Sequence, residues 1–257
     1  MNRPMRFTAP LLILLAVSEF VFAELPFADR FEPRMVLVDF DTDVVTWGPT
    51  TSEAELQQRG AASVSDGTRS IYIGTQQATS INQNPIVASF TNGVLDWVVN
   101  SYETGGPDGR AVGILWDQHK RLYVAMTVDG GGSGLEAFAT SGWQSSYGSG
   151  GGPRVTVLLR LSLADGQPLS GTFSIARLSS GNTNTVLPTD LMLVNNQIVL
   201  FANSFFAPLD VDLMRMTQTD TGGSPFPYRV VFDTELETAL SAEAIGWDGV
   251  TEFSPLP

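Results

Sequence analysis

A plan of strand, tight turn, strand, Gly-rich loop, strand, tight turn and strand recurs four times along this chain. The clearest copy is residues 85–130, PIVASFTNGVLDWVVNSYETGGPDGRAVGILWDQHKRLYVAMTVDG. Similar copies begin near Met35 and Val155, and a weaker copy begins near Asp210. A recurring four-stranded antiparallel unit of this size is typical of a β-propeller blade. We therefore expect an all-β fold, a small β-propeller of four blades or five at most, with a β-sandwich as the alternative.

Turn residues recur in phase with the strands, which supports the repeat. Thr91-Asn92-Gly93 offers the positive-φ residues of a tight hairpin, and Leu163-Ala164-Asp165-Gly166 takes the same place in another copy. Asp66-Gly67-Thr68 and Asn195-Asn196 correspond to a second set of turns. Such matched turns are stronger evidence for hairpins than strand propensity alone.

The apolar strand positions that recur between copies predict the core. One strand, Ala111–Trp116, is almost continuously apolar, as expected for a strand that is covered on both faces. The predicted core residues are Val38, Phe40, Val87, Phe90, Trp97, Ile114, Leu115, Tyr123, Leu159, Leu161, Leu193, Ile198, Val231 and Ile245.

The best copy resembles a known bacterial repeat. The pattern IVASF-TNG-VLDWVV, followed by DGRAVGILWD-QHKRLYVAMT, is similar to the SBBP-type β-propeller repeat over Ile86–Thr127, and Val155–Ser204 matches it loosely. The resemblance implies propeller blades, although members of that family close with more blades than this chain supplies. It implies no activity, because propellers carry many unrelated functions.

The first residues of the chain have the composition of an export signal. Two arginines precede the apolar run Leu11–Phe22, and small or branched residues lead up to Ala23. This pattern predicts a signal peptide at 1–23 and a single mature domain at 24–257, secreted or periplasmic. An uncleaved anchor or a buried helix is the alternative. No later apolar run has transmembrane length, so we expect no integral membrane segment after cleavage.

Composition excludes several classes of function. The chain has no cysteine, which rules out disulfides, a cysteine nucleophile and thiolate metal sites. Its formal net charge is −13, with only 14 Lys and Arg residues. Because binding to phosphate backbones needs a cationic face, we expect no nucleic-acid partner.

A Gly-rich insertion at 129–153 interrupts the repeat, and we expect it to lie between two blades. It carries Phe138, Trp143 and Tyr147 between two glycine clusters. Long irregular loops often carry function, so these aromatic side chains are the predicted ligand contacts. The alternative is that they pack on the edge of a neighbouring blade and shield it.

Alternating acidic residues suggest a calcium site. Asp39, Asp41 and Asp43 have the spacing of a calcium-binding loop, whose hard oxygen ligands suit Ca²⁺. Such a loop requires a glycine next, and Val44 stands there instead. The alternative is a hairpin whose aspartates favour the turn. No cofactor other than this possible calcium is expected.

Catalytic residues are not evident. The single histidine, His119, lies in a predicted turn, and no nucleophile motif accompanies it. Carboxylates at Asp108, Asp117, Asp190 and Asp248 could serve glycoside hydrolysis, which needs two of them at a defined separation, but each is also an ordinary turn former.

The function favoured by these observations is an exported binding or interaction module. Its ligand would be extracellular, either a carbohydrate or another polymer, or a protein. The alternatives are a glycan-acting hydrolase or lyase that uses loop carboxylates, and a structural component of the cell surface or matrix.

Overall fold

The protein is described by a computed structural model that covers residues 34–38, 43–103, 105–117, 121–131, 133–150 and 152–257. The predicted signal peptide lies outside these residues. Phe31–Pro257 form one compact unit. The two short helices of the described residues are α1 (Glu53–Gln58) and α2 (Ser133–Glu136). The strands are β1 (Arg34–Leu37), β2 (Ser63–Ser65), β3 (Arg69–Gln77), β4 (Gln83–Thr91), β5 (Val94–Val99), β6 (Gly109–Asp117), β7 (Arg121–Asp129), β8 (Arg154–Leu161), β9 (Pro168–Ser174), β10 (Ala176–Arg177), β11 (Thr183–Asn184), β12 (Val186–Val194), β13 (Gln197–Ser204), β14 (Ala207–Pro208), β15 (Phe226–Phe232) and β16 (Ala239–Ala244).

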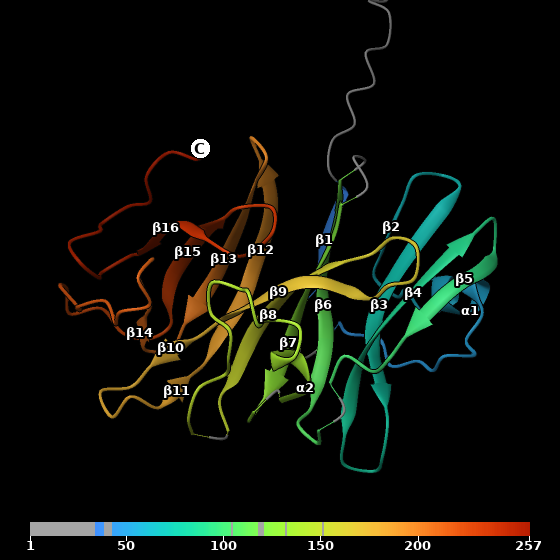
Figure 1. The fold of residues 1–257 in the computed structure, drawn as a ribbon, viewed down its shortest axis with the longest axis horizontal. Coiled ribbons are helices and arrows are strands. Elements are labelled where there is room, and N and C mark those ends of the chain that lie inside the picture. Colours follow the sequence, from blue (N-terminus) through green and yellow to red (C-terminus); the bar gives the residue numbers. More distant parts are fainter. Residues whose placement is uncertain (1–33, 39–42, 104, 118–120, 132, 151) are drawn as a thin grey trace, which may run out of the picture. The chain divides into compact units, whose positions relative to one another are not determined.

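Three antiparallel sheets make up most of the fold (Figure 1). Sheet I has the order β2-β3-β4-β5, sheet II has the order β1-β6-β7-β8-β9, and sheet III has the order β12-β13-β15-β16. A small fourth sheet, β11-β10-β14, consists of three very short strands. None of these sheets closes into a barrel. The prediction of an all-β fold is confirmed.

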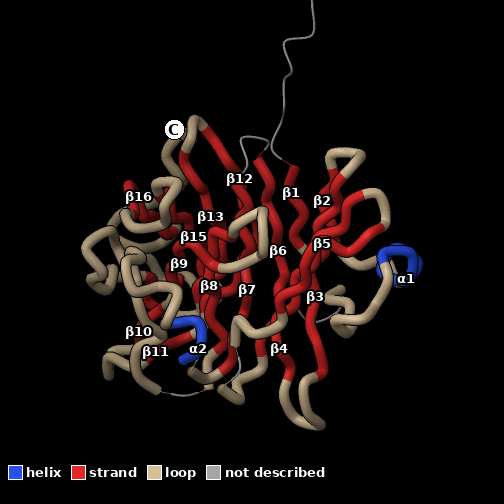
Figure 2. The backbone as a smooth tube through the Cα atoms, turned by 45° about the vertical axis from the view of Figure 1, so that its right-hand side comes forward, coloured by secondary structure: helices blue, strands red, loops and turns tan. Residues whose placement is uncertain are grey.

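Sheet II is the middle layer of the stack, between sheets I and III (Figure 2). Along β7, Val124 points into the core shared with sheet I, whereas its neighbour Tyr123 points into the core shared with sheet III. Strand β6 is buried along almost its whole length for the same reason. The nearly continuous apolar run Ala111–Trp116 therefore marks a strand covered on both faces, as its sequence predicts.

Most of the predicted core is buried. Ten of the 14 predicted residues are buried, including Phe90, Trp97 and Ile114. Val38, Leu193 and Ile245 are half-buried, and Phe40 lies outside the described residues.

The predicted repeat unit does not correspond to one sheet. Residues 85–130 divide between two sheets, because β4 and β5 end sheet I whereas β6 and β7 belong to sheet II. The strand at Met35 pairs with β6 instead of opening a blade of its own, and the last predicted unit has its strand at Phe226 and not near Asp210. Hairpins join the strands in both halves of the unit, so the repeat itself does not reveal which two hairpins share a sheet.

The predicted turns do fall into two equivalent sets. Residues 66–68 and 195–196 join the first and second strands of sheets I and III. Residues 92–93 join the last two strands of sheet I, and residues 162–167 join the last two strands of sheet II. Asn92 and Gly93 have φ values of 50° and 83°, the positive values that this two-residue hairpin requires. The prediction of these hairpins is therefore confirmed. The prediction of which hairpins share a sheet is wrong, because each sheet begins two strands away from the start of the predicted unit.

Strand β1, the first strand of sheet II, lies next to the first strands of sheets I and III. Strand β1 pairs with β6 and also contacts β2 and β12.

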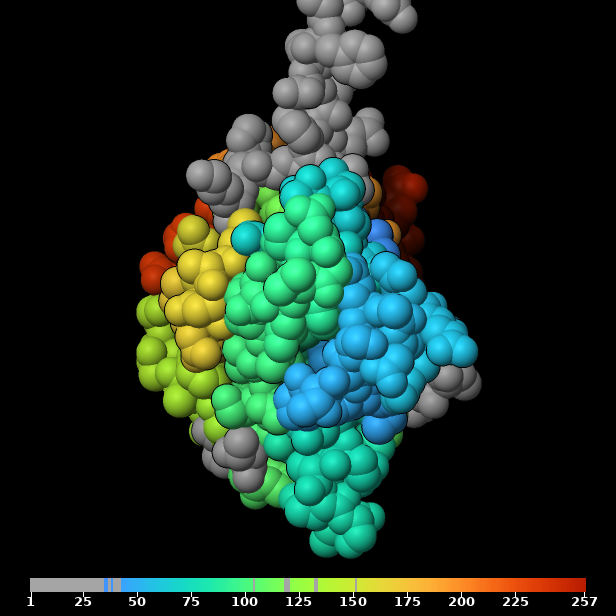
Figure 3. All heavy atoms as spheres, turned by 90° about the vertical axis from the view of Figure 1, so that its right-hand side faces the viewer, coloured from blue at the N-terminus to red at the C-terminus, as the bar shows by residue number. Residues whose placement is uncertain are grey.

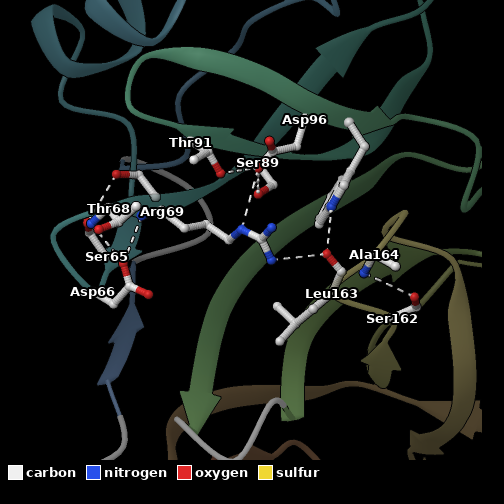
Figure 4. A network of polar contacts seen from close by, with 12 residues as sticks. Ser65, Asp66, Thr68, Arg69, Ser89, Thr91, Asp96, Ser162, Leu163 and Ala164 are labelled. Atoms are coloured by element: carbon white, nitrogen blue, oxygen red, sulfur yellow. Dashed lines mark hydrogen bonds and ion pairs between the residues drawn. The ribbon is translucent and has the colours of Figure 1, made fainter.

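Polar side chains tie sheet I to sheet II at the hairpin between β8 and β9. The indole Nε1 of Trp97 donates to the carbonyl of Leu163 at 3.0 Å. The guanidinium of Arg69 donates to the same carbonyl at 3.4 Å and forms an ion pair with Asp96 at 3.4 Å (Figure 4). The carbonyl of Leu163 thus accepts hydrogen bonds from two side chains of the neighbouring sheet.

An equivalent tie joins sheet II to sheet III. The hydroxyl of Tyr123 donates to the carbonyl of Thr234 at 2.9 Å, and Arg160 forms an ion pair with Glu235. Both acceptors lie in the hairpin between β15 and β16, the counterpart of the hairpin between β8 and β9. The contact between successive sheets is therefore repeated along the stack.

Candidate binding site on the outer face of sheet III

The outer face of sheet III, the face turned away from sheet II, presents a row of three side chains. The strand register places Phe201 opposite Arg229, and Arg229 opposite Glu243. Side chains alternate along a strand, and Tyr228 and Val230 point into the core shared with sheet II. Arg229 therefore points outward, in the middle of the row.

A segment that we call the strap (Thr251–Pro257) lies on this row. The ring of Phe253 packs edge-on against Phe201, with the ring centroids 5.8 Å apart. The same ring lies 5.0 Å from the guanidinium carbon of Arg229, a cation–π contact.

Hydrogen bonds hold the next residues of the strap. Ser254 accepts from Arg229 Nη1 at 2.7 Å through its carbonyl, and it donates to Glu243 through its backbone N–H at 3.2 Å and its hydroxyl at 2.5 Å. The carbonyl of Pro257 accepts from the side-chain amide of Asn195 at 2.7 Å. Consecutive residues of the strap, Phe253 and Ser254, thus contact neighbouring residues of the row.

A pocket of about 300 Å³ opens between the strap and the sheet. This volume is at the lower end of the range for small-molecule sites. The residues lining it are Gln197, Arg229, Val231, Leu240, Ser241, Glu243, Ser254, Pro255 and Pro257.

Three polar groups of the residues that line this pocket have no hydrogen-bond partner in the described part of the chain. Arg229 is only 4% exposed, and its buried Nε has no hydrogen-bond partner among the described residues. In the same part of the chain, the amide of Gln197 and the hydroxyl of Ser241 also lack partners. A buried donor without a partner is costly, and it is satisfied when a ligand supplies an acceptor.

The charge of the pocket is set by a paired carboxylate. Burial raises the pKa of Glu243, but hydrogen bonds from Ser254 and the guanidinium of Arg229 lower it by more, so the pKa lies below its ordinary value. Glu243 is therefore ionised at neutral pH and paired with Arg229. The pocket offers a balanced ion pair with neutral amide and hydroxyl groups beside it.

The Gly-rich insertion lies elsewhere. It joins β7 to β8 within sheet II, and so it does not lie between two blades. Tyr147 is buried, and its hydroxyl donates to the carbonyl of Pro153 at 2.9 Å. Phe138 is half-buried against the core shared by sheets I and II.

Trp143 ties the insertion to sheet III. Its indole Nε1 donates to the carbonyl of Val211 at 2.8 Å, and its ring packs edge-on against Phe232 at a centroid distance of 5.7 Å. These contacts agree with the packing alternative. The role of Phe138, Trp143 and Tyr147 in ligand binding stays a prediction.

Most of the predicted calcium site lies outside the described residues. Asp39 and Asp41 lie outside the described residues, and Asp43 is exposed at a turn. Among the described residues, no three acidic or histidine side chains form a group that could hold a metal ion. Calcium binding through Asp39, Asp41 and Asp43 stays a prediction.

The four loop carboxylates each bind nearby backbone. Asp117 is buried and paired with Arg121, and it accepts from the Arg121 N–H at 2.8 Å. The other three carboxylates, those of Asp108, Asp190 and Asp248, each accept from one backbone N–H at 2.8 Å. No two of the four share a hydrogen-bond partner in the described part of the chain, and their use as a catalytic pair stays a prediction.

Sequence reasoning missed the row on sheet III. The available signal was Arg229 inside the apolar strand FPYRVVF, followed by Glu243 in the next strand. An arginine is rarely buried unless it is paired, so this pattern could have predicted a cross-strand ion pair. Phe253 carried no comparable signal.

Comparisons with protein-family models, with curated proteins and with solved structures each returned no significant match. Neither helix of the described residues is long and apolar enough to cross a membrane.

Proposed function

We propose that the protein is an exported binding module whose ligand site is the pocket on the outer face of sheet III. The observation that carries the proposal is the unpartnered Nε of the buried Arg229, beside the free side chains of Gln197 and Ser241. The Nε of Arg229 is one of eight buried side-chain nitrogen and oxygen atoms without a partner in the described residues, and of these eight only Arg229 lines the pocket. Export is supported by the signal-like pattern of residues 1–23.

The architecture in this proposal is an open, propeller-like stack. Sheets I, II and III would be three blades, supported by the SBBP-type resemblance and by the equivalent ties between successive sheets. The small fourth sheet does not have the order of a blade, so four or five complete blades are not part of the proposal. An open stack leaves one face of its last blade available to a ligand.

The chemistry of the pocket suits a neutral, polar polymer. An amide, a hydroxyl and a guanidinium bind hydroxyl or carbonyl groups, and Val231, Leu240 and Pro255 offer an apolar wall. Carbohydrates and extended peptides both present this combination. The acidic protein as a whole does not favour nucleic acid.

The test is binding of the full chain to a glycan array and to a peptide array. The double variant Gln197→Ala with Ser241→Ala removes the two free neutral groups of the pocket. The matched control, Gln58→Ala with Ser145→Ala, makes the same changes at exposed positions. We expect a signal on one array that falls at least tenfold in the pocket variant and is retained in the control, with equal unfolding midpoints. No signal on either array, or an equal signal from both variants, would contradict the proposal.

A further inference from the structure

We propose that the outer face of sheet III is a peptide-recognition groove, and that the strap is its occupant supplied by the same chain. The ligand would be an extended peptide with an aromatic residue, then serine, then proline. This inference rests on the proposed function and names the ligand class of that site.

The row on the sheet matches consecutive residues of the strap. Phe253 contacts Phe201 and Arg229, and Ser254 contacts Arg229 and Glu243. The order of side chains across the strands is therefore the order of residues along the strap. A peptide that presents an aromatic ring followed by a serine meets the same partners in the same order.

The contacts combine general and selective recognition of a peptide. The carbonyls of Ser254 and Pro257 accept from Arg229 and Asn195, and any extended peptide has such carbonyls. The ring of Phe253 over the guanidinium and the serine hydroxyl on Glu243 are selective for side chains.

Proline suits this groove for two reasons. Pro255 and Pro257 have no N–H group, so neither needs a backbone acceptor. Proline also holds a segment extended before it binds, which reduces the entropy lost on binding.

The strap is bound only weakly to the outer face of sheet III. Of its seven residues, only Phe253 is half-buried, and the other six are exposed. The pocket beneath Pro255 and Pro257 is not filled by the strap. A tethered segment competes at an effective concentration of about millimolar, so a free peptide gains access when the contacts of the strap are weakened.

The experiment uses the full chain and a fluorescent peptide, Thr-Glu-Phe-Ser-Pro-Leu-Pro. The variant Phe253→Ala with Ser254→Ala keeps the strap but removes its selective contacts. We expect this variant to bind the peptide at least tenfold more tightly than the unaltered chain, as measured by fluorescence anisotropy. Adding Arg229→Lys to this double variant keeps the positive charge but removes the planar guanidinium group and its several N–H donors. We expect this change to weaken peptide binding at least tenfold.

Peptide controls need no change in the protein, so they remain informative if Arg229→Lys does not fold. A scrambled peptide of the same composition, and peptides with Phe→Ala or Ser→Ala, should each bind at least tenfold more weakly. The inference is overturned if the weakened-strap variant shows no saturable binding, or if the scrambled peptide binds equally. If a glycan binds through Gln197 and Ser241 while the peptide does not, the proposed function stands and the peptide inference fails.

Discussion

The outer faces of sheets I and III face the same physical problem and are covered in different ways. Each lies at an end of the stack, and each presents apolar side chains that no further sheet covers. On sheet I, the segment that carries α1 packs directly on the face, and Leu56 and Trp47 are buried (Figure 3). On sheet III the strap contributes only one half-buried residue, Phe253.

The cover of sheet I is joined to the sheet through backbone hydrogen bonds. Trp47 N donates to the carbonyl of Thr75 at 2.9 Å, and Thr75 N donates to the carbonyl of Val45 at 3.1 Å. The indole lies so close that a Cβ atom on Gly74 would come within 2.2 Å of its Nε1. Only glycine permits this approach, and the contact leaves no space for a ligand.

The cover of sheet III is held mainly by side chains and leaves a pocket. The strap does not pair with a strand in the described structure, and its contacts depend on Arg229, Glu243 and Asn195. A cover that is sealed by backbone bonds and buried apolar groups stabilises the fold. A cover that depends on a few exposed side-chain contacts can be displaced, and this difference points to sheet III as the binding face.

The largest expected effect is the loss of the apolar anchor on sheet I. Leu56 is 0% exposed, so Leu56→Ala should lower the free energy of unfolding by about 2–5 kcal/mol, as large-to-small core changes do. Urea unfolding monitored by tryptophan fluorescence measures this effect. Gln58→Ala, at an exposed position of the same helix, serves as the control. A loss below about 1 kcal/mol would show that sheet I is no better sealed than sheet III.

A smaller effect is expected from the start of α1. The Ser52 side chain accepts from the Glu55 N–H at the start of this helix, and in return the Ser52 N–H donates to Glu55 Oε2 at 2.9 Å. Ser52→Ala should cost about 1 kcal/mol, a typical value for a lost N-cap. Gln58→Ala, at the other end of the helix, should leave the unfolding midpoint nearly unchanged. Equal midpoints for the two variants would mean that the helix does not support the cover.

A still smaller effect on stability is expected from the strap. Phe253→Ala removes one half-buried ring and a cation–π contact, which at exposed sites contributes about 0.5–1 kcal/mol. Hydrogen exchange should nevertheless speed up at residues 251–257 and stay unchanged at α1. Global destabilisation as large as that of Leu56→Ala would remove the contrast between the two faces.

The smallest expected effect is a pH dependence of the strap on sheet III. The folded state lowers the pKa of Glu243 from its ordinary 4.5, so its contribution to stability is present above that value and is lost as the pH falls through the folded pKa. Acidification should therefore release the strap. Hydrogen exchange or NMR of residues 251–257 between pH 7 and about pH 3 follows this release. Glu243→Gln should make it much less dependent on pH, and an unchanged profile would contradict the assignment.

Some of the fold could be predicted because its causes are local. Alternating apolar residues predict strands, and pairs such as Asn92-Gly93 predict hairpins, since the required φ values depend on the residues at the turn itself. The burial of β6 on both faces could also be predicted from its composition. These features do not depend on which distant segment a strand meets.

The sequence by itself determined the strands, the hairpins and most of the core. The tertiary structure decided which hairpins share a sheet, that β1 pairs with β6, and that Phe253 covers Arg229. The physical reason is that strand pairing and end covering are contacts between residues far apart in the chain. Their free energy depends on how whole faces fit together, and no local pattern in the sequence records that fit.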